Sequence, residues 1–247
     1  MSAVPDAAQL PLFAAGASPG EFRVRVSARS RRLTVRVYPG GRVEVAVPRG
    51  TRPRAIERFV SRHRAWIEAR IAELASHPQA QEPPLPREVR LESLGRTVEV
   101  RYLKRARAGW RLTADGALEV YGDPGDVGRT RQTLRAWLTA TAREALEPWL
   151  RALARAHGFT IEQVQLRRQH TRWGSCSRTG TVSLNVCLLF QPQSVVRYLM
   201  LHELCHTRHM NHSERFWRLV GEYEPDYRAL DRALTRGWQH VPAWVYG

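Results

Sequence analysis

Three histidines and a glutamate near the C-terminal end have the residue types and spacing of a metal-dependent hydrolytic site. His202 and His206 lie four residues apart in a segment with helical periodicity, and Glu203 directly follows the first of them. Residues four apart on a helix lie one above the other, so two imidazoles can bind one tetrahedral ion. Glu203 then lies close to the ion without binding it, and it can take a proton from the water that the metal activates.

A third ligand is expected because a catalytic zinc ion usually has three protein ligands and one open position. His212 stands ten residues after His202, which is the ligand spacing of the metzincin signature. That signature has glycine where this chain has His209, and it includes a downstream methionine that this chain lacks after Met210. The likeness to metzincins is therefore limited to ligand spacing. The sequence predicts a Zn²⁺ site of three histidines, with Glu203 as the catalytic base.

The histidine pattern also has two weaker interpretations. An HExxH segment arises by chance in about 1% of chains of this length, and it would then be a structural histidine cluster. A purely structural zinc ion usually has four protein ligands, typically including cysteine. Cys205 lies between two of the histidines in sequence but on another part of the helix surface, so we expect it in the core.

Short strands and two helices are expected to position these side chains. Alternation of apolar residues predicts strands at residues 164–166, 171–176 and 181–186. Gly180 marks a tight turn before the last strand, and the helix with the HExxH segment is expected at residues 194–206. Ser213 is a plausible N-cap of the following helix, which would hold the chain in place directly after His212.

The N-terminal half has its own pattern. Two alternating segments, residues 33–38 and 43–47, flank Pro39-Gly40-Gly41 and predict a β-hairpin. Residues 53–74 predict one amphipathic helix that packs on this hairpin. Its expected apolar positions are Ile56, Phe59, Val60, Trp66, Ile67, Ile71 and Leu74. The proline-rich residues 76–86 predict an extended connection.

More strands and a long helix complete the expected elements. The strands are expected at residues 89–91, 96–103, 110–112 and 117–121. The helix is expected at residues 126–157, ended by Gly158, with Pro148 as the point where it can kink. These elements predict an α+β fold. We expect a flexible leader at residues 1–20, a β-rich region with one amphipathic helix at 21–125, and the catalytic domain at 126–247.

Composition bears on location and partners. The formal net charge is +16, and all but one of the 39 basic residues, Lys104, are arginine. Clustered arginine favours an anionic partner such as nucleic acid or a nucleotide, although a codon usage rich in Arg, Ala and Gly explains the charge equally well. The three cysteines form no CxxC pair, which argues against disulfides and a cysteine-ligated zinc. Without a signal-like or membrane-spanning segment, we expect a cytoplasmic protein.

Several short motifs of this chain occur together in one known family. They are Trp173-Gly-Ser-Cys176, Leu184-Asn185, Tyr198 with His202-Glu-Leu-Cys-His206, Asn211-His-Ser213 and Phe216-Trp217. In these motifs the chain resembles the YgjP-like family (domain of unknown function 45) of predicted zinc metallohydrolases. Arg64-Ala-Trp66-Ile67 also resembles the family's leading region, so the likeness covers most of residues 22–236. It implies a compact zincin-like catalytic domain of the minigluzincin type, similar to those of SprT-like and WLM proteases, with three histidine ligands and a glutamate base.

The resemblance leaves the substrate open. The family is described as metallopeptidase-like and, for some bacterial members, as a metal-dependent UTP pyrophosphatase, and both reactions use the same activated nucleophile. In related folds the strand before the active helix is the edge that pairs with an extended substrate, which predicts this role for residues 181–186. Trp173, Arg172 and Asn185 are candidates for substrate contact. A metallopeptidase is the first prediction, a nucleotide pyrophosphatase the alternative, and a nucleic-acid-associated binding protein the third.

Overall fold

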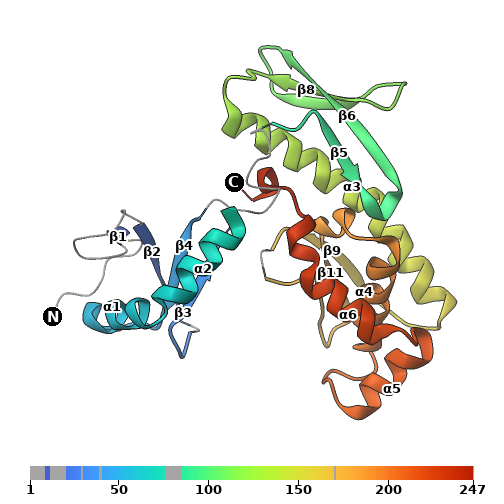
Figure 1. Ribbon diagram of the computed structural model, residues 1–247. Coiled ribbons are helices and arrows are strands. Elements are labelled where there is room, and N and C mark those ends of the chain that lie inside the picture. Colours follow the sequence, from blue (N-terminus) through green and yellow to red (C-terminus); the bar gives the residue numbers. More distant parts are fainter. Residues whose placement is uncertain are drawn as a thin grey trace. The chain divides into compact units, whose positions relative to one another are not determined.

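The computed structural model (Figure 1) describes residues 9–11, 21–28, 30–38, 41–75, 85–169 and 171–246. The chain divides into two compact units, Met1–Glu82 and Pro83–Gly247. In the described residues, no helix combines the length and the apolar character needed to cross a bilayer.

Unit 1 is built around a four-stranded sheet with the order β1-β2-β4-β3. Its strands are β1 (Gln9–Pro11), β2 (Glu21–Val26), β3 (Thr34–Val37) and β4 (Val43–Val47). The predicted hairpin is confirmed, because β3 and β4 pair antiparallel, although Pro39 and Gly40 of its turn lie outside the described residues. β2 pairs parallel with β4, and β1 adds three residues of the expected leader to the sheet. The rest of that leader lies outside the described residues.

Two helices, not one, cover the sheet of unit 1. They are α1 (Pro53–Arg62) and α2 (Arg64–Ala75). The chain turns at His63, whose backbone N–H donates to the carbonyls of Phe59 and Val60 at 3.2 and 3.0 Å. Ile56, Val60 and Ile67 are buried against the valines of β2 and β4. Trp66 was expected on the buried side, and this is wrong: its side chain is 51% exposed, because after the turn Ile67 takes the position facing the core.

Unit 2 begins with a second four-stranded sheet, of order β5-β6-β8-β7. Its strands confirm the predicted ones: β5 (Glu88–Leu91), β6 (Arg96–Lys104), β7 (Gly109–Leu112) and β8 (Leu118–Gly122). A short 3-10 turn, η2 (Glu92–Leu94), joins the first two. The long helix α3 (Val127–Ala156) packs on β7 and β8. It begins where the Asp126 side chain accepts a hydrogen bond from the N–H of Arg129 (2.9 Å), and it runs on through Pro148.

The rest of unit 2 holds a three-stranded sheet and the remaining helices. The strands are β9 (Gln163–Arg167), β10 (Gly174–Cys176) and β11 (Thr181–Asn185). The helical elements are η3 (Val186–Phe190), α4 (Gln193–Cys205), α5 (Glu214–Tyr223), α6 (Tyr227–Arg236), η4 (Gly237–His240) and η5 (Ala243–Val245). α4 packs against α6 and against β10 of this sheet. The predicted α+β class is confirmed.

One core joins all of unit 2. Apolar residues of β5, β6 and β8 belong to the same buried cluster as those of α3, β11 and α4. The first strands of unit 2, which the sequence groups with the N-terminal region up to residue 125, therefore share a core with the catalytic elements. The physical reason is α3, whose apolar side chains pack against strands of both sheets of this unit.

Candidate metal centre

Two of the histidines lie on successive turns of α4. This helix packs against α3, α5, α6 and β10, so most of its side chains are buried. His202 is partly exposed and His206 caps the helix at its C-terminal end. The four-residue spacing brings the two ring centroids to 5.0 Å.

His212 completes the cluster from the loop between α4 and α5. Ser213 is the N-cap residue of α5, as the sequence predicts, although its side chain makes no capping hydrogen bond. The nitrogens that His202, His206 and His212 offer all lie within 4.8 Å of one another. Nε2 of His212 lies 3.2 Å from Nε2 of His202. The structure therefore brings the three predicted ligands together.

Hydrogen bonds to the far ring nitrogens orient two of the imidazoles. Nδ1 of His206 donates to the carbonyl of His209 at 3.0 Å. Nδ1 of His202 lies 3.4 Å from the hydroxyl of Tyr198, which itself donates to a carboxylate oxygen of Asp231 at 2.9 Å. A ring whose Nδ1 carries the proton presents the Nε2 lone pair to an ion. Asp231 lies on α6, and no motif in the sequence indicates this role.

Aromatic side chains of α5 pack against the imidazole rings of the three histidines. The ring of Phe216 lies 4.9 Å from His202, 4.4 Å from His206 and 4.8 Å from His212, measured between centroids. Trp217 lies 5.5 Å from His212 and stacks on it. The periodicity of α5 predicts that Phe216 is buried, but the sequence does not indicate that it packs on the ligands.

Burial favours the neutral form of His202 and His206. Burial, together with the neighbouring His206 and His212, lowers the pKa of His202 to about 3. Burial also lowers the pKa of His206, although the hydrogen bond to the His209 carbonyl opposes this. Neutral imidazole is the form that binds a metal ion. The three nitrogen donors therefore fit a divalent metal.

Glu203 lies against the edge of the three-stranded sheet. Its side chain is only 4% exposed, and Oε2 is buried without a hydrogen-bond partner among the described residues. Burial raises the pKa of this carboxyl group to about 8, which the positive charge of Arg172 opposes. A buried carboxylate oxygen without a partner is costly, and such a group fits a site completed by a ligand. This is the second observation that fits a metal centre.

Gly174 of β10 makes room for Glu203. A Cβ atom at this position would lie 2.6 Å from Oε1 of Glu203, closer than real Cβ contacts. β10 therefore passes directly over the carboxylate, and only glycine allows this approach.

The strand at the edge of the three-stranded sheet is not the one that the sequence predicts. The sheet order is β10-β11-β9, so β11 has a partner strand on each side. The prediction that residues 181–186 form the edge is wrong, and β10 takes this place. The reason is that β9 pairs parallel with β11 after the chain has crossed over, an order that the individual strands do not indicate.

The three predicted substrate-contact residues lie on or beside β10 and β11. Trp173 is 7% exposed and its ring stacks on Trp238, with 3.9 Å between centroids. Asn185 is 2% exposed; its Nδ2 donates to the carbonyls of Gln169 and Arg172 at 2.7 and 2.8 Å. These contacts give Trp173 and Asn185 structural roles, and contact with a substrate stays a prediction.

Arg172 is exposed, and its guanidinium is close enough to affect the pKa of Glu203. Cys205 is fully buried, as expected.

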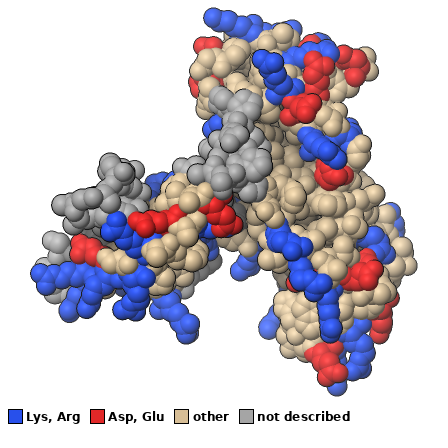
Figure 2. Space-filling model, viewed as in Figure 1, with Lys and Arg blue, Asp and Glu red and all other residues tan. Residues whose placement is uncertain are grey.

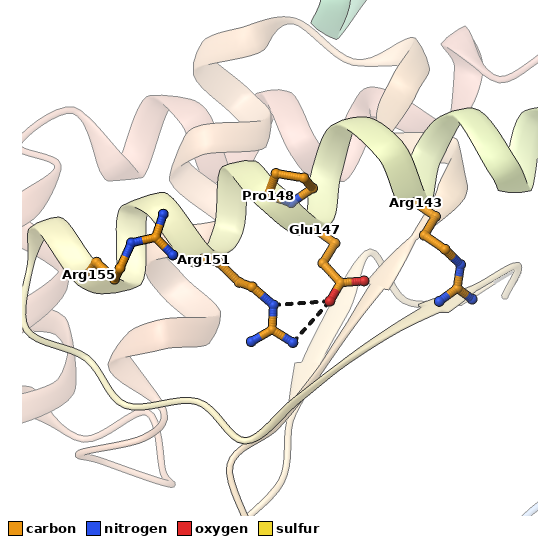
Figure 3. Close-up of a pocket in the computed structure, with 5 residues that line it drawn as sticks. All are labelled: Arg143, Glu147, Pro148, Arg151 and Arg155. Carbon is orange, nitrogen blue, oxygen red and sulfur yellow. Dashed lines mark hydrogen bonds and ion pairs between the residues drawn. The ribbon is translucent and has the colours of Figure 1, made fainter.

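A hollow elsewhere in unit 2 is separate from this chemistry. It has a volume of about 370 Å³ and lies along the exposed side of α3 (Figure 3). Its lining residues are Arg143, Glu147, Pro148, Arg151 and Arg155. None of them belongs to the histidine cluster, so the hollow is not the hydrolytic site.

Comparison with known proteins agrees with this site. The model of the YgjP-like family, metallopeptidase domain, matches residues 31–237. No curated protein matches the chain. The crystal structure of the metallopeptidase zymogen of Pyrococcus abyssi abylysin is similar over 36% of this chain and 92% of that one, with 26% identity and a TM-score of 0.33. At that TM-score the likeness does not bear on the fold.

Proposed function

Because the chain belongs to the YgjP-like family of metallopeptidase domains and is a metal-dependent hydrolase, we propose that it is a zinc-dependent peptidase acting on extended peptide segments. The observation that supports this best is the cluster of His202, His206 and His212 beside the buried carboxylate of Glu203. Three protein ligands leave one coordination position open, as catalytic zinc sites do.

Zinc suits the donor set. Three imidazoles and no carboxylate or thiolate in the cluster favour zinc over magnesium or calcium, which prefer oxygen ligands. When bound, zinc acts as a Lewis acid that lowers the pKa of water and polarises the scissile carbonyl. In our proposal the histidines hold the ion, and Phe216 and Tyr198 keep their rings in place.

Glu203 is the proposed general base. Its carboxylate takes a proton from the attacking water and then gives it to the amine of the leaving peptide. Its surroundings are dry, and charge interactions are stronger in such a low-dielectric site than in water. β10 passes close to the carboxylate at Gly174 and limits where this side chain can lie.

The open edge of β10 is the proposed binding strip for the peptide backbone. The carbonyl of Trp173 accepts from the N–H of Asn185 (2.8 Å), and the N–H of Ser177 donates to the carbonyl of Thr181 (2.9 Å). Both groups therefore face β11. Since backbone direction alternates along an antiparallel strand, the N–H and C=O groups of Gly174 and Cys176 face away from β11. An extended peptide can pair with these groups directly beside Glu203.

A nucleotide pyrophosphatase is the alternative that remains for the same metal site. It requires convergent arginines to bind the phosphates. Arg167 and Arg172 line a shallow hollow beside β10, but its cavity volume is about 0 Å³, whereas pockets that bury small ligands measure roughly 300–1,000 Å³. The geometry therefore favours the peptide over the nucleotide. We also propose a cytoplasmic location, where the three free cysteines would stay reduced.

The test compares Glu203→Gln with the unchanged protein. Both are loaded with zinc and incubated with a peptide library and, separately, with nucleoside triphosphates. We expect peptide cleavage by the unchanged protein and a loss of roughly 10²–10⁴-fold in the variant, because Gln cannot accept the proton. Zinc content should not change. Glu222→Gln is the matched control, since Glu222 is exposed and lies outside the histidine cluster.

Two results would overturn parts of the proposal. Hydrolysis of nucleoside triphosphates without peptide cleavage would mean that the metal site acts on nucleotides, as the alternative states. Full activity of Glu203→Gln would mean that Glu203 is not the base.

A further inference from the structure

A row of arginines lies along α1, which belongs to unit 1, whereas the metal centre belongs to unit 2. Arg54, Arg58 and Arg62 are each four residues apart, and all three side chains are exposed. This spacing places them on the same side of the helix, over a length of about 12 Å. We call these three residues the α1 arginine stripe. Figure 2 shows Lys and Arg side chains gathered over this part of unit 1.

The stripe is not neutralised by acidic side chains. Other arginines of unit 1 form ion pairs, namely Arg25 with Glu44, Arg64 with Glu68 and Arg70 with Glu73. In the described part of the chain, no carboxylate forms an ion pair with a residue of the stripe. This includes Glu57, the acidic residue of α1 itself.

Helix stability does not explain the stripe. Like charges four residues apart repel each other and destabilise a helix. The helix dipole favours Arg62 in the last turn, but it disfavours Arg54 in the first turn, where acidic side chains are preferred and α1 has none. The apolar side of α1, Ile56 and Val60, is already buried against the sheet, so the arginines do not serve the core. An external anion is the physical partner that offsets their repulsion.

An exposed aromatic ring follows the stripe. Trp66 lies four residues after Arg62, at the start of α2, and is 51% exposed. Nucleic-acid bases stack on such rings, whereas the bases of a duplex are already stacked on each other. A lipid surface fits less well, because the apolar side of α1 is unavailable for insertion into a bilayer.

We propose that the α1 arginine stripe and Trp66 form a binding surface for single-stranded nucleic acid. The guanidinium groups bind successive phosphates, for which their planar donor geometry is suited. Trp66 stacks on a base of the same strand. This surface uses no metal ligand, so its binding does not depend on zinc or on the proposed peptidase activity.

The experiment measures binding of the full chain to a fluorescein-labelled, mixed-sequence 20-nucleotide single strand by fluorescence anisotropy at several salt concentrations. Each phosphate contact contributes about 0.7 to the slope of log K against log salt for a single strand. The triple variant Arg54→Gln, Arg58→Gln, Arg62→Gln should therefore lower the magnitude of the slope by about 2 and weaken binding at least tenfold. Trp66→Ala should weaken binding by roughly tenfold with little change in slope. Chelation of zinc should change neither value.

A matched control comes from the hollow on α3 (Figure 3). Arg143, Arg151 and Arg155 are also three arginines on one side of a helix, but Glu147 lies between them and pairs with Arg151 at 3.0 Å. Changing all three to Gln removes the same net charge. This control should keep most of the binding and of the slope, and circular dichroism should show that each variant is folded.

The proposal fails if the two triple variants weaken binding equally, because net charge alone would then explain the association. It also fails if the protein shows no binding to the single strand at low salt, or if it prefers anionic phospholipid vesicles. Tighter binding to a duplex, unchanged in Trp66→Ala, would likewise overturn the assignment to single strands.

Discussion

Gly174→Ala tests whether the position of Glu203 against β10 sets the rate of hydrolysis. The added Cβ atom would lie 2.6 Å from Oε1 of Glu203, 2.9 Å from Cγ and 3.0 Å from Cδ. Ordinary contacts of a Cβ atom begin at 3.4 Å, so the carboxylate must retreat by about 0.8 Å or β10 must move away. The atoms that clash belong to the end of a flexible side chain, and we therefore expect the fold to persist.

The expected loss of kcat follows from how far the Glu203 carboxylate is displaced. A misplacement of about 1 Å at a catalytic group can cost roughly 10²-fold in rate. We expect kcat on the peptide found in the library screen to fall by about that factor. Zinc content should stay the same, because the clash involves Glu203 and none of the three histidines. The melting temperature should change by only a few degrees.

The control is Gly109→Ala in β7, where the added Cβ atom would lie 3.8 Å from the Tyr121 ring, an ordinary contact. This variant should keep full activity. If Gly174→Ala retains activity within about threefold while it binds zinc, the observed position of Glu203 is not the one that catalyses. Loss of zinc in Gly174→Ala would show that β10 supports the ligands, contrary to the contacts described above.

Three further predictions concern the metal ligands, their supporting contacts and the thiols. His212→Ala, like alanine at either other ligand, should lose zinc during dialysis against a chelator; undiminished zinc by elemental analysis would remove His212 from the site. Tyr198→Phe should weaken zinc binding roughly 10–100-fold in a chelator competition at an unchanged melting temperature, and unchanged affinity would leave Tyr198 a packing role alone. Burial raises the pKa of Cys176 to about 11 and those of Cys187 and Cys205 to about 12, so little thiolate exists at pH 8. A disulfide reagent should react slowly with the native protein, at Cys176 first, and complete reaction within seconds would contradict this.

The sequence alone was sufficient for the parts of the site that depend on local geometry. Helical spacing brings His202 and His206 to one side of α4, and it does so whatever the helix packs against. The third ligand, His212, follows after a short loop, which limits how far it can lie from the first two. The strands of unit 2 were predicted within a few residues, because alternation of apolar side chains is a property of each strand by itself.

Only the tertiary structure decided which elements become neighbours. The edge strand proved to be β10 and not β11, because strand order depends on how the chain crosses over between β9 and β10. The contact between Asp231 and Tyr198 joins residues 33 positions apart, and the contact of Gly174 with Glu203 joins residues on different elements. No periodicity within one segment contains this information. Such contacts form when buried surfaces of distant segments fit together, and that fit is a property of the whole core.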